Sequence, residues 1–246
     1  MKYLIYILSS LWRFWLLCMF LLVFIGAFPF LYFYTGIVKN NQAVLKISRY
    51  WGKISLTLSG IFYKIDLEEK LDPDKTYIFC ANHTSTIDIP LITSIIPLPI
   101  CYIGKDDLSN IPIFGYLFKN NHVIVNRKSL VNSYNAFINA GEKIDKGINL
   151  CIFPEGGIPK SSVFLRKFKN GAFKLSTEKE IEIVPITLPD NKKHFPQEYY
   201  KGFPGLIRIK IHKPIKYNRL NKNLIEDYNI YVYNIIFEQL KRYGYQ

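Results

Sequence analysis

The chain has 246 residues, which is enough for about one domain with a sizeable hydrophobic core. Its 32 lysine and arginine residues outnumber 19 aspartate and glutamate residues, and the resulting net charge of +13 favours an anionic partner such as a membrane surface or a phosphorylated substrate. Basic and aromatic residues are spread along the chain rather than gathered in one stripe, which disfavours nucleic acid. The four cysteines are dispersed without a Cys-x-x-Cys pair, which argues against a disulfide framework or a zinc site.

The first predicted element is a membrane anchor. Residues 14–38 carry no charge, and such a run is long enough for a bilayer core, which needs about 20 apolar residues. Trp12 and Trp15 lie at one end, as aromatic residues at a membrane interface do. A cleaved signal peptide is the alternative, but its apolar part is typically only about 7–15 residues long. Pro29 leaves open whether the run spans the bilayer or bends into one leaflet.

The orientation of this anchor follows from its flanking charges. More lysine and arginine residues follow the run than precede it. Positive charges gather on the cytoplasmic side of a membrane. We therefore expect an inner (cytoplasmic) membrane protein whose remaining domain faces the cytoplasm.

An amphipathic helix is expected next. Its apolar residues recur at steps of three and four, at Val44, Ile47, Trp51, Ile54, Leu58 and Ile61. Basic residues keep the same rhythm on another face, so the helix either lies in a membrane interface or packs on the core with a solvated basic side. Acidic residues and Pro73 then mark a change of character. The sequence thus predicts an anchoring region over residues 1–63 and a second domain over residues 64–246.

The second domain alternates between strand and helix patterns. Strands are predicted at 76–80, 100–103, 122–125, 148–153, 181–187 and 207–211, and helices at 87–97, 129–145, 168–178 and 224–243. A helix-loop segment over 105–119 and a Gly/Pro-rich loop over 154–163 separate some of them. This alternation predicts an α/β fold with a mixed, mostly parallel sheet flanked by helices.

Residues that can carry chemistry follow the first of these strands. Asn82 and His83 come directly after it, and Asp88 follows five residues beyond the histidine. A histidine can remove a proton from a hydroxyl at neutral pH, and a carboxylate bonded to its other nitrogen fixes the tautomer. Ser85-x-x-Asp88 is also a variant of the helix capping box, in which Asp88 would serve only the start of a helix.

Four short blocks, each at a predicted strand end, resemble the glycerolipid acyltransferase family, which includes the 1-acylglycerol-3-phosphate acyltransferases. They are NHTSTID at 82–88, VIVNR at 123–127, FPEGG at 153–157 and IVPI at 183–186. The segment from Lys105 to the IPIFG at 111–115, and the FKNGAF at 168–173, resemble further segments of that family. The resemblance covers about residues 76–190.

The resemblance implies a catalytic mechanism. His83 would be the general base on the free hydroxyl of a lysophospholipid, and the alkoxide would attack an acyl thioester. Asp88 would orient and stabilise the imidazolium, as the carboxylate of a serine hydrolase does. Because the substrate itself is the nucleophile, no covalent acyl-enzyme is needed. Ser85 as a nucleophile is disfavoured against a helix-capping role.

The resemblance also implies which residues bind substrate. They are Asn82, Lys105, Arg127, Glu155, Gly156, Gly157 and Pro185. Arg127 would bind a phosphate, with an ordinary surface arginine as the alternative. Glu155 and Gly156 would bind the glycerol part of the acceptor, with a tight turn and a solvated glutamate as the alternative. Pro185 would shape a strand near the acyl channel or be a bulge or edge residue.

The third block departs from the family. The family usually continues after Glu-Gly with threonine and arginine, whereas this chain has Gly157 and Ile158. A phosphate-binding cation is therefore missing from its usual place. The candidates to replace it are Lys105, Lys160, Arg166 and Lys167. The second block differs as well, with Asn121 at a common glycine position and Asn126 at a common acidic one.

The sequence therefore predicts a membrane-bound enzyme that converts 1-acylglycerol 3-phosphate to phosphatidate in phospholipid biosynthesis. The donor would be a thioester of acyl carrier protein or coenzyme A, and the anionic membrane surface a further partner. No cofactor is implied, and the other histidines lack the spacing of metal ligands. A phosphate-free lyso-aminolipid as acceptor, or a catalytically silent lipid-binding scaffold, remain alternatives because of the altered third block.

Overall fold

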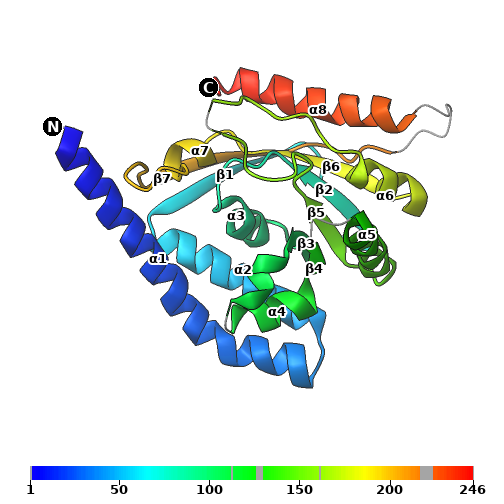
Figure 1. Cartoon of the computed structure of the whole chain (residues 1–246), viewed down its shortest axis with the longest axis horizontal. Helices are drawn as coiled ribbons and strands as arrows, with labels where there is room; N and C mark the ends of the chain where they lie inside the picture. The colour runs from blue at the N-terminus through cyan, green and yellow to red at the C-terminus, as the bar shows by residue number, and fades with distance from the viewer. Residues whose placement is uncertain (1, 112, 126–129, 161, 217–223, 246) are drawn as a thin grey trace.

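A computed structural model describes residues 2–111, 113–125, 130–160, 162–216 and 224–245 of the chain. Its centre is a seven-stranded sheet with the order β1-β7-β6-β2-β5-β3-β4 (Figure 1). The strands are β1 (Ile61–Leu67), β2 (Tyr77–Ala81), β3 (Ile100–Lys105), β4 (Val123–Val125), β5 (Asn149–Ile152), β6 (Glu182–Thr187) and β7 (Gly205–Ile211). Within the described residues the neighbouring strands are parallel except for β6 and β7. The predicted α/β fold with a mixed, mostly parallel sheet is therefore confirmed.

Helices cover both faces of this sheet. They are α1 (Lys2–Tyr32), α2 (Asn41–Leu58), α3 (Asp88–Ile95), α4 (Phe114–Asn121), α5 (Leu130–Asp145), α6 (Gly171–Lys179), α7 (Asn191–His194) and α8 (Leu224–Arg242). A π-helical turn, η1 (Phe33–Ile37), follows α1, and a 3₁₀ turn, η2 (Asp106–Asn110), follows β3. Helices α1, α2 and α3 lie on one side, and α6 and α8 on the other (Figure 1).

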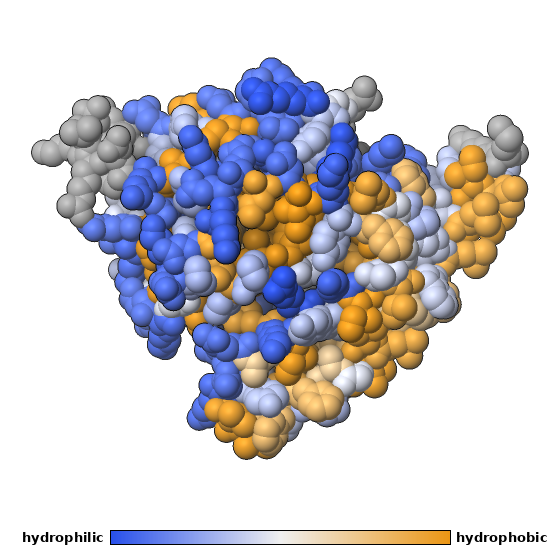
Figure 2. Space-filling model, turned by 180° about the vertical axis from the view of Figure 1, so that it is seen from behind, coloured by the Kyte–Doolittle hydropathy of each residue, from blue (hydrophilic) through white to orange (hydrophobic). Residues whose placement is uncertain are grey.

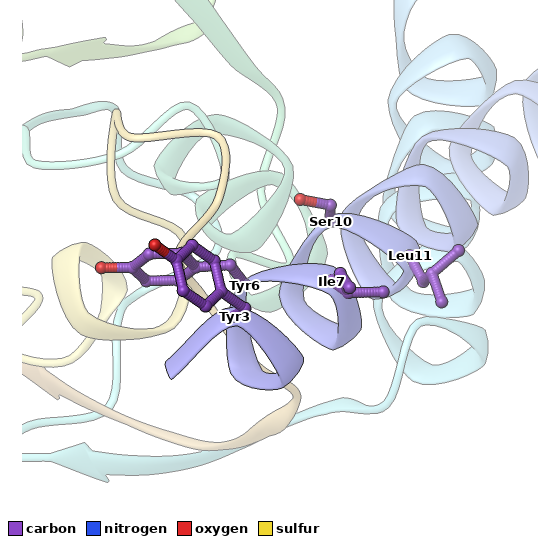
Figure 3. Close-up of a pocket in the computed structure, with 5 residues that line it drawn as sticks. All are labelled: Tyr3, Tyr6, Ile7, Ser10 and Leu11. Carbon is purple, nitrogen blue, oxygen red and sulfur yellow. The ribbon is translucent and has the colours of Figure 1, made fainter. Parts of the chain in front are cut away.

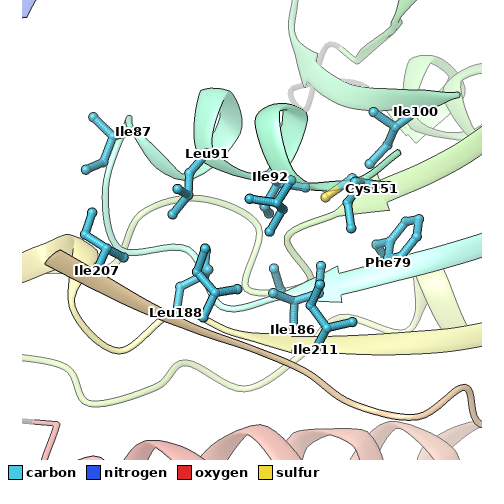
Figure 4. Close-up of a cluster of buried hydrophobic side chains, with 14 of the residues drawn as sticks. Phe79, Ile87, Leu91, Ile92, Ile100, Cys151, Ile186, Leu188, Ile207 and Ile211 are labelled. Carbon is cyan, nitrogen blue, oxygen red and sulfur yellow. The ribbon is translucent and has the colours of Figure 1, made fainter. Parts of the chain in front are cut away.

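Strand β2 shows why its sequence is apolar at every position. Tyr77 and Phe79 point into the cluster under α3, whereas Ile78 and Cys80 point into the cluster under α6 and α8. A central parallel strand is covered on both faces, so it does not alternate with polar residues. Figure 4 shows the first cluster, in which Leu91 and Ile92 of α3 point toward the sheet and Phe79 of β2 lies beside Cys151 of β5. This packing fixes the end of β2, from which the candidate site begins.

Strand β1 is absent from the sequence-based prediction. The predicted amphipathic helix reaches Ile61, but α2 ends at Leu58, because Gly60 takes a positive φ of 74° and bonds back to the carbonyl of Thr57. Ile61 instead begins β1, which pairs in parallel with β7. Charged residues interrupt this edge strand, and they hide its pattern. The sheet therefore contains residues on both sides of the domain boundary expected after residue 63.

Helix α1 lies along the domain over much of its length. The indole N–H of Trp12 donates to the carbonyl of Ser59 at 2.9 Å, and that of Trp15 donates to the carbonyl of Leu58 at 3.0 Å. Further along, the indole of Trp51 donates to the carbonyl of Phe20 at 3.2 Å. The helix continues through Pro29 to Tyr32, so this proline does not bend the chain out of the helix.

One face of α1 remains uncovered and apolar. Among the described residues, α1 with η1 is the helical segment that is long and apolar enough to cross a membrane, by length and composition only. Its exposed side chains recur along one side, at Leu4, Leu8, Leu11, Trp15, Leu22 and Ile25. Figure 2 shows hydrophobic residues gathered along this helix. Tyr50, Ile54 and Leu58 of α2 are exposed as well.

The opposite face of α1 carries a buried charge. Arg13 is only 3% exposed, and its guanidinium lies 4.0 Å from the centre of the Phe195 ring. It also donates a hydrogen bond to the carbonyl of Pro196. A buried guanidinium needs such partners because its desolvation is costly. Arg13 therefore joins α1 to the loop that follows α7.

Candidate active site

The site begins where β2 and β6 end side by side. Asn82 follows β2 and is fully buried, and its side chain exchanges two hydrogen bonds with the backbone of Leu188. The amide donates to the carbonyl of Leu188 at 3.0 Å and accepts from its N–H at 2.7 Å. Both polar atoms of Asn82 are thus used to join the two strand ends. This contact turns the chain so that the next residue, His83, leaves the sheet.

His83 and Asp88 are in direct contact. The Nδ1 atom of His83 lies 2.8 Å from Oδ2 of Asp88. The side chain of Asp88 is fully buried, whereas that of His83 is 14% exposed. With a carboxylate as its acceptor, Nδ1 carries the ring proton, and Nε2 keeps a lone pair. The exposed part of the histidine can therefore accept a proton from a bound hydroxyl.

Asp88 accepts three further hydrogen bonds. The backbone N–H groups of Thr84 and Ser85 donate to Oδ2 at 2.7 and 3.0 Å. The amide of Asn191, in α7, donates to Oδ1 at 2.5 Å. The two interpretations of Asp88 are therefore compatible, because one carboxylate serves the start of α3 and orients the histidine ring. Charge-assisted bonds of this kind hold a carboxylate firmly in place.

The third motif lies directly under the histidine. The ring of Phe153, which follows β5, stacks on the His83 ring with 4.0 Å between centres and an interplanar angle of 20°. Two residues later, Glu155 is fully buried. Its Oε1 accepts from the backbone N–H of His83 at 2.7 Å, and its Oε2 accepts from the backbone N–H of Arg166 at 2.9 Å. The alternative of a solvated glutamate is therefore wrong.

Burial also changes the acidity of Glu155. Desolvation raises the pKa of its carboxyl group, and the hydrogen bonds from His83 and Arg166 oppose this shift only in part. Both carboxylate oxygens are used by backbone groups. In this arrangement Glu155 positions two loops, and the expected contact with an acceptor's glycerol would need one of these bonds to open.

Gly156 and Gly157 form the turn that the sequence suggests. Their φ angles are 81° and 147°, which residues with a side chain rarely adopt. The N–H of Gly156 donates to the carbonyl of Phe153 at 3.0 Å. A Cβ atom added at Gly156 would lie 2.8 Å from Cε and 2.9 Å from Nζ of Lys169. This lysine is not among the cations that the sequence singled out.

Ser85 is used in the packing of the loop. Its hydroxyl donates to the carbonyl of Phe195 at 2.5 Å and lies 3.4 Å from the N–H of Ile87, near the start of α3. A nucleophilic serine would need a base at its hydroxyl. The partner of Ser85 is a backbone carbonyl, which favours the structural interpretation of this residue.

Three of the expected substrate-binding residues lie elsewhere or outside the described part. Pro185 is buried within β6, opposite Cys80 of β2, so it is neither an edge residue nor at the strand end. Lys105 ends β3, but nothing is described of its side chain. Arg127 lies outside the described residues, two positions after the end of β4.

Asn191 and Phe153 were missed as site residues. Asn191 lies 103 residues from Asp88 in the chain and belongs to a helix of only four residues, so no periodic pattern marks it. A signal was present, however, because a polar Pro-Asp-Asn sequence follows the apolar strand β6. Phe153 reads as the last residue of a core strand, although β5 ends at Ile152.

One further hollow lies away from His83 and Asp88. A hollow of about 380 Å³ lies on the first turns of α1, lined by Tyr3, Tyr6, Ile7, Ser10 and Leu11 (Figure 3). All five residues belong to α1, and their surface is mostly apolar, so this hollow belongs to the exposed face of that helix. Within the described residues no group of three or more histidine, cysteine or acidic side chains could hold a metal ion.

Comparisons with known proteins place the chain among acyltransferases. The sequence model of the family described as Acyltransferase matches residues 63–189. A 1-acyl-sn-glycerol-3-phosphate acyltransferase of Saccharomyces cerevisiae is 28% identical over 214 residues, which are 86% of this chain and 70% of the yeast protein. One of Helicobacter pylori is 29% identical over 185 residues, or 72% of this chain and 74% of that protein.

Other relatives are longer, and a solved structure shares the fold. The chloroplast enzyme LPAT1 of Arabidopsis thaliana, also a 1-acyl-sn-glycerol-3-phosphate acyltransferase, is 31% identical over 178 residues, which are 69% of this chain but only 48% of the plant protein. The crystal structure of PlsC, the 1-acyl-sn-glycerophosphate acyltransferase of Thermotoga maritima, superposes with a TM-score of 0.80 and 23% identity. It covers 100% of this chain and 99% of that one.

Proposed function

This chain belongs to the acyltransferase family, and we propose that it transfers a fatty acyl group from a thioester to the free hydroxyl of 1-acylglycerol 3-phosphate, forming phosphatidate. The observation that carries this proposal is the contact between Nδ1 of His83 and the buried carboxylate of Asp88 at 2.8 Å. It leaves Nε2 of a partly exposed histidine as the base. Acyl carrier protein or coenzyme A would carry the acyl group.

The reaction needs one base and no covalent acyl-enzyme. His83 Nε2 takes the proton of the 2-hydroxyl while the oxygen attacks the thioester carbonyl, and a tetrahedral intermediate forms. When the intermediate collapses, the carbon–sulfur bond breaks. The imidazolium then returns the proton to the departing thiolate, so the products are an ester and a free thiol. His83 ends in its starting state.

The surrounding residues support this role by holding the ring. Asp88 fixes the tautomer of His83 and stabilises the imidazolium. The stacked Phe153 covers one face of the ring and limits its rotation. Glu155 holds the backbone of His83. We further propose that Arg127 binds the phosphate of the acceptor, as the family resemblance implies, because β4 delivers the chain to the edge of the sheet where β2 and β5 end.

A second acceptor class follows from one departure in the sequence. Ile158 stands where the family's third block usually has an arginine, so a lyso-aminolipid without a phosphate is the alternative acceptor. The geometry of His83 and Asp88 suits either acceptor, because both present a free hydroxyl. A silent lipid-binding scaffold is disfavoured, since it would not need a base with an open nitrogen.

The N-terminal helices α1 and α2 are suited to binding a membrane. We propose that α1 and α2 place the enzyme on the cytoplasmic face of the inner membrane, where a lysophospholipid resides. The exposed face of α1 is apolar, and its opposite face contacts the domain through Trp12 and Arg13. Trp15 is half exposed, and its indole N–H donates to the carbonyl of Leu58 in α2. These contacts favour a helix that enters one leaflet by its exposed face over one that leaves the domain to span the bilayer.

An acyl-transfer assay tests the proposed function. Purified protein in mixed micelles would receive a thioester donor with 1-acylglycerol 3-phosphate or, in parallel, a phosphate-free lysolipid. We expect product from the phosphate acceptor, and its loss in His83→Ala while the circular dichroism spectrum stays unchanged. Product from the phosphate-free lipid alone would show that the acceptor is a lipid without a phosphate. Near-normal turnover by His83→Ala would remove the general-base mechanism.

A further inference from the structure

The turn over residues 153–157 lies between the catalytic histidine and a basic segment. On one side, Phe153 stacks on His83, and Glu155 holds its backbone. On the other side, the N–H of Arg166 bonds to Glu155 Oε2, and the N–H of Lys169 bonds to the carbonyl of Pro154 at 2.8 Å. Residues 166–169 therefore wrap around the same turn that supports the base.

The side chain of Lys169 continues over this turn. Its Cε and Nζ atoms occupy the space that a Cβ atom at position 156 would need, at 2.8 and 2.9 Å. The positive φ of 81° favours glycine at position 156, and the missing side chain leaves room for the end of the lysine. The lysine is exposed, so its ammonium group is open to a ligand from solvent or from a membrane.

Lys169 forms no ion pair with a carboxylate within the described part of the protein. Lysines there that pair with carboxylates include Lys75, Lys179, Lys201, Lys210, Lys216 and Lys241. The nearest acidic group along the turn, Glu155, already has both oxygens bonded to backbone N–H groups. The ammonium group of Lys169 has no carboxylate partner among the described residues, and it lies at the turn that supports His83. Such a cation is suited to bind an anionic part of the substrate.

The acceptor's chemistry places its phosphate close to the base. In 1-acylglycerol 3-phosphate the phosphate is attached to the carbon next to the one that bears the reacting hydroxyl. A group that binds the phosphate must therefore lie beside the group that deprotonates the hydroxyl. The family motif has an arginine after its third block for which this chain has Ile158. The ammonium of Lys169 lies at the same turn.

We propose that Lys169 binds the phosphate of the acceptor and takes the place of the cation that is missing at Ile158. This inference rests on the proposed function, since it assumes that the phosphate lipid is the acceptor. It selects a residue outside the four cations that the sequence suggested. The alternative is a packing role, in which the methylene groups of Lys169 only cover Gly156, and this alternative can be tested as well.

Three variants separate charge from packing. Lys169→Met keeps an aliphatic chain over Gly156 and removes the charge, whereas Lys169→Arg keeps the charge. Lys174→Met is the matched control, because Lys174 is an exposed lysine five residues further on, in α6. Equilibrium binding to protein in neutral detergent micelles would be measured for 1-acylglycerol 3-phosphate and for 1-monoacylglycerol, and turnover would be measured separately.

We expect Lys169→Met to weaken binding of the phosphate lipid by roughly 10- to 100-fold, as the loss of one charged hydrogen bond does. Binding of 1-monoacylglycerol should be unchanged, Lys169→Arg should largely restore the affinity, and Lys174→Met should resemble the wild type. Equal affinity of Lys169→Met and wild type for the phosphate lipid would overturn the proposal. An equal loss for both lipids would do the same, since it would show a packing role.

The two measurements separate this inference from the proposed function. Lys169-dependent binding of the phosphate lipid without turnover would support the binding site and contradict the acyl transfer. Turnover of the phosphate lipid with binding that does not depend on Lys169 would support the acyl transfer and contradict the binding site.

Discussion

The backbone N–H of His83 donates a 2.7 Å hydrogen bond to Oε1 of Glu155, so the third motif holds the loop that carries His83. The two residues are 72 positions apart in the chain. Glu155 is therefore a positioning residue in this structure, and its effect on catalysis should pass through the histidine.

The first prediction separates positioning from substrate binding. Glu155→Gln has nearly the same shape, but its NH₂ group must face one of two backbone N–H donors, so one bond is lost. We expect kcat to fall by roughly 10- to 100-fold while the KM for the acceptor changes little. Steady-state kinetics at several acceptor concentrations would measure both. A raised KM with an unchanged kcat would instead show that Glu155 binds the acceptor directly.

The second prediction concerns pH and stability. Burial raises the pKa of Glu155 above its ordinary value of 4.5, so the folded protein holds this proton more tightly than the unfolded chain. Stability from this group is therefore present below pH 4.5 and is lost as the pH rises through the raised pKa. Glu155→Gln cannot titrate there. As the pH rises from 4.5 through the raised pKa of Glu155, the Tm of the wild type should fall relative to the Tm of Glu155→Gln. A difference in Tm that does not change with pH would contradict this prediction.

The third prediction tests the residue that the sequence did not reveal. Asn191→Ala removes the bond to Oδ1 of Asp88 and leaves the three bonds to Oδ2 in place. The carboxylate becomes less well held, and we expect kcat to fall by about tenfold without a comparable change of KM. Lys193→Ala is the control, because Lys193 also lies in α7 but its side chain is exposed, and this variant should keep the kcat of the wild type. Equal rates for Asn191→Ala and Lys193→Ala would show that this bond does not matter for turnover.

The fourth prediction concerns the contact between α1 and the domain. Arg13→Met removes a buried guanidinium that lies over Phe195 and donates to Pro196. We expect the free energy of unfolding to fall by about 2 kcal/mol, the value of a charged hydrogen bond with its ring contact. Thermal unfolding in detergent would measure the loss. Arg13→Lys should recover only part of it, because an ammonium group cannot stack as a guanidinium does; full recovery would show that charge alone matters.

Local patterns predicted much of the site, and long-range contacts account for what they missed. His83, Asp88 and the Gly156 turn follow from motifs in which each residue's role depends on near neighbours. Asn191 contacts Asp88 across 103 residues, and only the packing of α7 beside α3 brings them together. Strand β1 was missed because an edge strand carries charges that break the apolar pattern. Lys169 was missed because the direction of a side chain over a glycine has no signature in the sequence.

The tryptophans of the N-terminal region show another limit. Trp12 and Trp15 are typical of an interface, yet their indole N–H groups bond to the last turn of α2 and the residue after it. Composition shows that a segment is apolar, but it does not show which part of that surface the protein itself covers. Here one face is covered and the other is open.

The docking of α1 has a consequence for enzyme design. Leu16 of α1 is part of the same buried cluster as Leu56 and Ile61, so removing the helix to obtain a water-soluble enzyme would expose the interior of the catalytic domain. An anchor joined by a flexible linker would let an active site sample many heights above a bilayer. On the proposed membrane placement, a helix fixed to the domain would set one height and one tilt, so folding itself would determine the depth at which His83 meets a lipid hydroxyl.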